Sequence, residues 1–327
     1  MKALVTGARG FIGSFLVEEL LKKGMEVWCL LRNPQRGYGW LQGLDFRVVE
    51  GDITEPTTLA DPVKRMDYVF HVAGLTKAFR KKQFDLVNGE GTRNLMHAVC
   101  KFNPGVNRFV LVSSLAAAGP SPDGKPLTEN ARPRPVSHYG RSKLKAERVT
   151  QKFAKEIPVS IVRPPTVFGP RDKDVFRFFK STKQGWRPVL GGGPRYASLI
   201  YVKDLVQGLL LVVEKEVAIG QIYYLSNDDS YSWDRFGEAL TKVIGENSRT
   251  ITIPISLAFI VALGFEIYSK IIKQPHLLNL DKYKEIKAIY WVCDNSKAKK
   301  DLGFQSKCSL EDALKETFEW DVANSWF

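Results

Sequence analysis

The stretch "KALVTGARGFIGSFLVEELLKKGMEVWCLLRNP", residues 2–34, decides how this chain begins to fold. It opens with a short apolar run, turns on three glycines, and then repeats apolar side chains at helical spacing. This order predicts a buried strand, a tight turn and an amphipathic helix. Backbone N–H groups at the start of such a helix point towards the turn and attract an anion. The opening apolar run is also too short for a signal peptide.

The three glycines are spaced Gly-x-x-Gly-x-x-Gly, with one more residue between the first two than in the common dinucleotide fingerprint. Gly7 permits the sharp turn, Gly10 lets a phosphate approach the backbone, and Gly13 lets the helix lie close to its strand. The position between a strand and a helix favours dinucleotide binding over a purely structural turn. The loop residues that we expect to contact the cofactor are Gly7, Arg9, Gly10, Phe11, Ile12 and Gly13.

Size and composition narrow the class of protein. The 327 residues exceed the usual size of one hydrophobic core, so we expect an α/β unit with a satellite lobe. The four cysteines are scattered without paired spacing, which predicts neither a disulfide nor a metal site and favours a reducing, cytoplasmic compartment. The formal net charge is +13, yet no nucleic-acid-binding motif accompanies it. We therefore expect no nucleic-acid partner, while an acidic small molecule, a phosphorylated cofactor or an anionic membrane surface stays open.

Strand-like and helix-like segments alternate up to about residue 165. After the first strand, further strands are predicted at residues 25–32, 45–52, 67–74, 108–114 and 159–165, and helices at residues 84–102 and 138–156. Continuous apolar strands separated by helices predict a parallel sheet covered on both faces. The expected fold is therefore a doubly wound α/β sheet of the Rossmann type, with functional residues at the carboxyl ends of the strands.

The second half of the chain has a looser pattern. We assign residues 1–165 to the nucleotide-binding domain and residues 166–327 mainly to a smaller, mostly helical substrate-binding lobe, with strands and helices near residues 198–226 returning to the first domain. The most apolar segment of this half, Ile251–Phe265, falls short of the roughly 20 residues that span a bilayer. We expect a core helix or an apolar substrate lid there, and a membrane-facing surface is the alternative.

Tyr139 and Lys143 lie four residues apart, which places both side chains on one face of a helix. A free phenol has a pKa near 10, and we expect the lysine cation to lower it and make the phenol an acid–base catalyst. Tyr283 and Lys287 have the same spacing. Only the first pair follows a buried strand that ends in a serine, Ser114, so we interpret the second pair as part of a solvated helix.

Further motifs follow in a fixed order, namely "TGARGFIG", "GDIT", "HVAG", "VNGEGTRNL", "VSSLAAAG", "YGRSK", "RPPTVFGP" and "YVKDL". Over nearly its whole length the chain resembles the extended short-chain dehydrogenases/reductases of the NAD(P)-dependent epimerase/dehydratase superfamily. The resemblance implies that Ser114 hydrogen-bonds the substrate oxygen, that Tyr139 donates or accepts the proton, and that Lys143 binds the nicotinamide ribose and tunes Tyr139. Hydride would pass between nicotinamide C4 and the substrate.

The resemblance also implies cofactor contacts beyond the glycine loop. They fall on Asp52, Ile53, Ala73, Gly74, Asn88, Tyr139, Lys143 and Pro164. For Asn88 a helix N-cap is the alternative interpretation. His71 is expected to contribute backbone contacts rather than act as a base, and His138 points around its helix away from Tyr139.

The end of the second strand bears on the choice of dinucleotide. NAD-binding relatives place an acid there that holds both ribose hydroxyls, whereas this chain has Leu31 followed by Arg32. A guanidinium binds a 2′-phosphate in bidentate fashion, and Arg9 could add a second cation. We therefore expect NADP to be preferred, with NAD possible; a solvated strand end is the alternative for Arg32.

Two enzymatic readings follow from the resemblance. In the first, the protein resembles dihydroflavonol reductases and 3β-hydroxysteroid dehydrogenases, which act on a carbonyl or alcohol of a largely hydrophobic molecule. In the second, it resembles nucleotide-sugar epimerases and dehydratases with tightly bound NAD. Dehydratases need an acid pair where Leu115 and Ala116 stand, and the diphosphate-binding arginine of that branch would fall near Ala197, with Arg195 two residues away. We therefore favour the first reading.

A non-catalytic redox sensor on the same fold is a third hypothesis, and the retained Ser114, Tyr139 and Lys143 disfavour it. The helices that begin near Phe84 and Tyr139 form the usual dimer surface in relatives, so we expect a homodimer. We expect the protein in the cytoplasm, with peripheral membrane contact possible.

Overall fold

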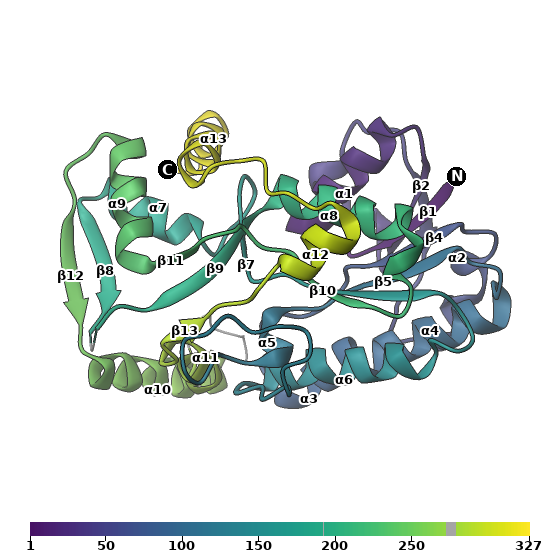
Figure 1. Cartoon of the computed structure of the whole chain (residues 1–327), viewed down its shortest axis with the longest axis horizontal. Coiled ribbons are helices and arrows are strands. Elements are labelled where there is room, and N and C mark those ends of the chain that lie inside the picture. Colours follow the sequence, from purple (N-terminus) through teal and green to yellow (C-terminus); the bar gives the residue numbers. More distant parts are fainter. Residues whose placement is uncertain (192, 273–278) are drawn as a thin grey trace.

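The computed structural model describes residues 1–191, 193–272 and 279–327. Its centre is a parallel sheet of seven strands in the order β3-β2-β1-β4-β5-β6-β10 (Figure 1). The strands are β1 (Lys2–Thr6), β2 (Glu26–Leu31), β3 (Arg47–Glu50), β4 (Tyr68–His71), β5 (Arg108–Val112), β6 (Val159–Arg163) and β10 (Ile222–Tyr224). This order winds outwards in both directions from β1, as in a Rossmann fold, and confirms the predicted fold class.

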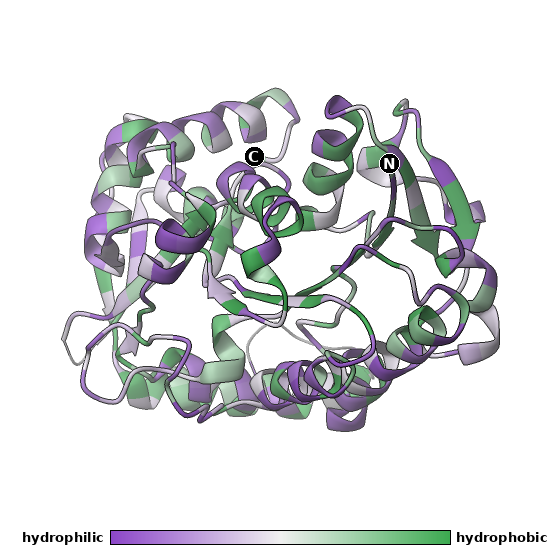
Figure 2. Cartoon of the chain, turned by 45° about the vertical axis from the view of Figure 1, so that its right-hand side comes forward, coloured by the Kyte–Doolittle hydropathy of each residue, from purple (hydrophilic) through white to green (hydrophobic). Residues whose placement is uncertain are grey.

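Helices cover both faces of the sheet because successive strand residues point to opposite sides. Ala3 and Val5 of β1 pack in the core beneath α1 (Phe11–Lys22) and α8 (Val202–Glu214). Leu4, between them, packs in a second core beneath α4 (Gly91–Phe102) and α6 (His138–Lys152). The strands are correspondingly apolar, and hydrophilic residues lie over the outer helices (Figure 2).

The smaller part of the molecule combines helices with two small sheets. One sheet joins β9 to β11, β13 and β7, and the other pairs β8 with β12. The strands are β7 (Thr166–Phe168), β8 (Trp186–Leu190), β9 (Tyr196–Tyr201), β11 (Ser230–Ser232), β12 (Arg249–Ile253) and β13 (Tyr290–Trp291). The helices are α7 (Phe176–Lys183), α9 (Trp233–Ile244), α10 (Ile255–Ile272), α11 (Leu280–Ile286), α12 (Ser296–Leu302) and α13 (Leu310–Ala323).

The apolar segment Ile251–Phe265 is not a core helix. Its first residues form β12 and the remainder begins α10, whose large apolar side chains are mostly exposed. The core-helix expectation was wrong because the helix buries small residues, Ala258 and Ala262, and presents its bulky ones to solvent, while the substrate lid stays a prediction. Across the residues described, no helix combines the length and apolar character that a membrane crossing requires.

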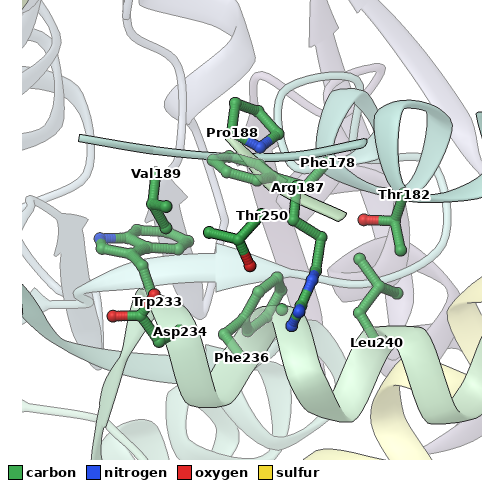
Figure 3. A pocket seen from close by; sticks show the side chains of 11 residues that line it. Phe178, Thr182, Arg187, Pro188, Val189, Trp233, Asp234, Phe236, Leu240 and Thr250 are labelled. Carbon is green, nitrogen blue, oxygen red and sulfur yellow. The ribbon is translucent and has the colours of Figure 1, made fainter. Parts of the chain in front are cut away.

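A small cavity lies in this part of the molecule, between α7, β8 and α9. Figure 3 shows Arg187 extending between Phe236 and Leu240, with Trp233 on the opposite side of the cavity. The cavity holds about 20 Å³, which is room for a single water molecule. It is therefore too small for an organic substrate, and its lining includes none of the predicted site residues.

Candidate active site

The glycine loop between β1 and α1 is a close-packed turn. Gly7 has φ +73°, and a Cβ there would lie 2.7 Å from the backbone nitrogen of Ala73. A Cβ on Gly13 would lie 2.2 Å from the carbonyl oxygen of Gly7, so α1 rests directly on the turn. Gly10 donates its N–H to that same carbonyl at 2.9 Å and precedes the first residue of α1.

This turn fits the pyrophosphate of a dinucleotide. In the part of the chain that the structure describes, no side chain caps the N-terminus of α1 and no acid stands in its first turn. Its free N–H groups and the positive end of the helix dipole are therefore left for an anion. Phe11 and Ile12 begin the helix and pack against the main core, so they shape the turn from beneath.

Two arginines lie near the end of β2. Arg32 is exposed directly after that strand, and Arg9 extends from the glycine loop to donate to the carbonyl of Asn33 at 2.7 Å. Both residues thus belong to the loops that follow β1 and β2 at the carboxyl edge of the sheet. Asp52, after β3, accepts hydrogen bonds at 2.8 Å from both the N–H and the hydroxyl of Thr54. Its carboxylate therefore stabilises the turn in which it lies.

The end of β4 forms the adjoining wall. His71 lies buried between Thr6 and Thr92, with bonds of 2.8 and 2.9 Å. Burial, with a smaller contribution from Lys143, lowers the pKa of His71 to about 3, so the imidazole is neutral and structural. Thr6 also accepts the N–H of Ala73 at 3.1 Å, which fixes the chain just before Gly74.

Asn88 is not a helix N-cap. It lies inside a π-helical segment, Asp85–Glu90, where its amide exchanges two bonds with the backbone of Leu75 and donates to Ser142 at 2.9 Å. It therefore ties the loop after β4 to α6. A Cβ on Gly74 would lie 3.1 Å from the Asn88 side-chain oxygen, so the two residues leave a narrow, polar space.

The candidate catalytic side chains come together where β5 meets α6. Ser114 caps the short helix α5 (Leu115–Ala118), and its hydroxyl is also within hydrogen-bonding reach of the Tyr139 phenol. Gly140 allows this approach, because a Cβ there would lie 2.3 Å from the carbonyl oxygen of Ala116. Lys143 follows one turn later and donates to the Val112 carbonyl at 2.7 Å.

The pKa of Tyr139 differs in direction from the sequence expectation. Burial raises it to about 12, the bond from Ser114 only partly opposes this, and Glu285 raises it further. Burial also lowers the pKa of Lys143 to about 8, against the attraction of Glu147. Desolvation of the phenol is thus the largest influence on its pKa, and the expected lowering by the lysine is not among the causes of the shift. The group is a protonated phenol at neutral pH, suited to donating a proton.

Sequence reasoning missed a buried ion pair beneath these residues. Arg163 donates to both carboxylate oxygens of Glu147, at 2.8 and 2.7 Å, and Ser113 donates to the same carboxylate at 2.5 Å. The pair joins the ends of β5 and β6 to α6. Pro164, just after Arg163, accepts the N–H of Leu115 at 2.8 Å and closes the same wall. Glu147 stands four residues after Lys143 on the same face of α6, but its partner Arg163 lies on β6, so no local spacing could have signalled this pair.

Comparison with known proteins agrees with this geometry. Residues 3–225 match the NAD dependent epimerase/dehydratase family, and the chain belongs to that family. It is 30% identical over 324 residues to a ceramide reductase of Caulobacter vibrioides, across 98% of this chain and 95% of the relative. It is 27% identical over 346 residues to a 3-beta-hydroxysteroid dehydrogenase of Mycolicibacterium neoaurum, across 96% of this chain and 90% of the relative.

Among solved structures, MoeE5 in complex with UDP-glucuronic acid and NAD superposes with a TM-score of 0.78 and 26% identity, over 99% of this chain and 100% of that one. The similar proteins thus include a ceramide reductase, a hydroxysteroid dehydrogenase and a protein that binds a nucleotide sugar. The family establishes an NAD(P)-dependent enzyme of the extended short-chain dehydrogenase/reductase type.

Proposed function

We propose that the protein is an NADP-preferring reductase or dehydrogenase that exchanges hydride with a carbonyl or hydroxyl group of a largely hydrophobic small molecule. The observation that carries this proposal is the placement of Arg195. Its guanidinium donates to the backbone carbonyls of Lys287 and Gly191, at 2.8 and 3.3 Å, and the residue is 8% exposed. An arginine held in this way offers little to the diphosphate of a nucleotide sugar.

Two further features support a hydrophobic substrate. Leu115 and Ala116 occupy the positions after Ser114 where a sugar-nucleotide dehydratase needs acids, and both are buried. The similar ceramide reductase and 3-beta-hydroxysteroid dehydrogenase are named for lipid substrates. The nucleotide-sugar reading is kept as the alternative because of the likeness to MoeE5.

In the proposed mechanism, Ser114 donates a hydrogen bond to the substrate oxygen and Tyr139 transfers its proton to that oxygen as hydride adds to the carbon. The raised pKa of Tyr139 supports this reductive direction, since the phenol carries its proton at neutral pH. Lys143 would hold the nicotinamide ribose, Asn88 would support the loop beside it through its bonds to Leu75 and Ser142, and a bound NADPH would supply the hydride.

The preference for NADP rests on Arg9 and Arg32. They lie where a carboxylate would otherwise hold the adenosine ribose, and they present positive charge to a 2′-phosphate. The loop residues Gly7, Gly10 and Gly13 would hold the pyrophosphate, and Ile53 and Asp52 would line the adenine side. We also propose a cytoplasmic homodimer, built on the helices that begin near Phe84 and Tyr139, with peripheral membrane contact.

One set of measurements tests the proposal. We expect the purified protein to oxidise NADPH in the presence of an apolar ketone, and Tyr139→Phe to abolish turnover while still binding NADPH. Arg32→Ala should lower the affinity for NADPH at least about tenfold more than the affinity for NADH, as expected for the loss of one bidentate phosphate contact. Purification with tightly bound NAD, together with turnover of a UDP-sugar, would instead establish the alternative. Full activity of Tyr139→Phe would refute the mechanism.

A further inference from the structure

The outer face of α10 is a continuous apolar stripe. Ala258 and Ala262 are buried against the rest of the protein, whereas Ile260, Ile267 and Ile271 are 62%, 53% and 73% exposed. These three isoleucines recur at helical spacing and so lie along one side of the helix. Single exposed apolar residues are ordinary, but a row of large ones along a whole helix marks an interaction surface.

The helix beside α10 carries charge in an ordered way. α11 packs on α10, and the ring of Tyr283 meets that of Phe259 at 5.3 Å. Its two acids, Asp281 and Glu285, are mostly buried towards α6, while the two lysines between them are exposed; Lys282 pairs with Glu285, and Lys284 does not. The sequence of α11 thus turns negative charge inwards and leaves positive charge on the surface next to the apolar stripe.

Two more cations join Lys284. Burial lowers the pKa of His138, and the nearby Asp281 carboxylate opposes this shift. The charges of Arg141, Lys81 and Lys284 lower the same pKa further. These three cations therefore lie around the His138 imidazole. All three are exposed, and they come from α6, α3 (Lys81–Phe84) and α11. Figure 1 places these helices and α10 along the same, lower edge of the molecule. We call Lys81, Arg141 and Lys284 the basic cluster.

We propose that the apolar stripe of α10 and the basic cluster dock the protein on the surface of an anionic lipid bilayer. An apolar helix lying in the interface, with cations beside it at headgroup level, is the arrangement that binds such surfaces. A second copy of the chain seated on α10 fits less well, because a two-fold contact over α10 and α11 would bring the exposed lysines of the two copies together on a protein of net charge +13, and the homodimer proposed above is built on other helices.

The docking surface is joined to the active site. Glu285 of α11 accepts a bond from Ser137 at 2.5 Å, and Asp281 accepts the N–H of His138 at 2.9 and 2.8 Å. These are the two residues before Tyr139. A substrate taken from the bilayer would therefore enter beside the catalytic helix, a consequence that rests on the proposed function, whereas docking itself is measured without turnover.

Flotation with lipid vesicles tests the inference. The full chain should bind vesicles of phosphatidylcholine with about 30 mol% phosphatidylglycerol, and at least about tenfold more weakly vesicles of phosphatidylcholine alone. The double variant Ile260→Asp/Ile267→Asp should lose at least about 100-fold in affinity, since each change removes an apolar group and adds a repelled charge. Val217→Asp, at an exposed apolar residue outside α10, is the matched control and should bind like the parent protein. Circular dichroism confirms that each variant is folded.

The charge contribution is measured separately. Lys81→Glu/Lys284→Glu should weaken binding to the anionic vesicles by at least about 25-fold, about fivefold for each lysine lost. Equal binding to both lipid mixtures, or unchanged binding of the Ile260→Asp/Ile267→Asp variant, would overturn the inference. The inference would also be overturned if the parent protein did not bind vesicles and instead formed a dimer that the Ile260→Asp/Ile267→Asp variant dissociates. If the Ile260→Asp/Ile267→Asp variant turns over a dissolved ketone but not a ketone held in vesicles, that result supports docking. Turnover and vesicle flotation are separate measurements, so the failure of one does not decide the other.

Discussion

Replacing Glu147 with glutamine measures how strongly the buried ion pair supports the active site. Its carboxylate receives two bonds from Arg163 and one from Ser113, and the side chains of both charged partners are 2% exposed. Glutamine retains the shape but leaves the guanidinium charged and uncompensated in the interior. Loss of one partner of such a pair costs about 3–5 kcal/mol. We expect Glu147→Gln to lower the free energy of unfolding by that amount, measured by urea denaturation followed by circular dichroism.

Two controls separate charge from packing. Glu90→Gln removes a carboxylate that pairs with Arg93 and Lys145 at the surface, and it should cost less than about 1 kcal/mol. The double variant Glu147→Leu/Arg163→Met removes both buried charges, so it should recover most of the stability lost in Glu147→Gln. A cost for Glu147→Gln as small as that for Glu90→Gln, or a double variant no more stable than Glu147→Gln, would refute this reasoning.

Three further outcomes follow from the geometry. Because burial lowers the pKa of Lys143 to about 8, kcat/KM should fall above about pH 8; a profile that stays flat two pH units higher would contradict a need for the ammonium. Burial, aided by Asp172, raises the pKa of Asp321 to about 7, so its neutral form stabilises the fold in acid and this contribution is lost as the pH rises from about 4 to 7. Asp321→Asn should therefore raise stability by about 4 kcal/mol at pH 8 and leave it unchanged near pH 4, as thermal unfolding would show; equal effects at both values would contradict the assignment. Gly13→Ala places a Cβ 2.2 Å from the carbonyl oxygen of Gly7 and should weaken NADPH at least about tenfold in a fluorescence titration, and unaltered affinity would show that the loop does not hold the cofactor.

The central sheet was predictable because its strands are buried on both faces and therefore read as continuous apolar runs. The predicted segments 25–32 and 159–165 contain β2 and β6, and the helix at 138–156 contains α6. Among the strands of the smaller part, only β9 (Tyr196–Tyr201) is a comparable apolar run, and a strand was expected there; the shorter ones gave no such signal. β12, for example, has mostly exposed residues, and its pairing with β8 depends on chain segments about 60 residues apart.

The candidate site was predictable in position but not in electrostatics. Ser114 and Tyr139 could be expected together, since the carboxyl ends of neighbouring strands and the following helix meet at one edge. The pKa of the phenol depends on how completely the fold removes it from water, and sequence spacing carries no such information. The same limit applies to Arg195, whose carbonyl partners come from a turn and from the end of α11.

The seven-residue helix α11 contacts both the residues that bear on substrate choice and the helix proposed to dock on a membrane. Its C-terminal end supplies the Lys287 carbonyl that holds Arg195, its buried Glu285 fixes the start of the catalytic helix, and Tyr283 packs on α10. The contact that holds the Arg195 guanidinium is therefore made by the same helix that packs on α10, where docking is proposed. A substrate rich in negative charge would lack its partner here and meet an apolar approach, whereas a hydrophobic ketone would meet neither obstacle. The proposed reductase function and the proposed membrane docking thus both depend on the packing of α11, although each is tested by a different experiment.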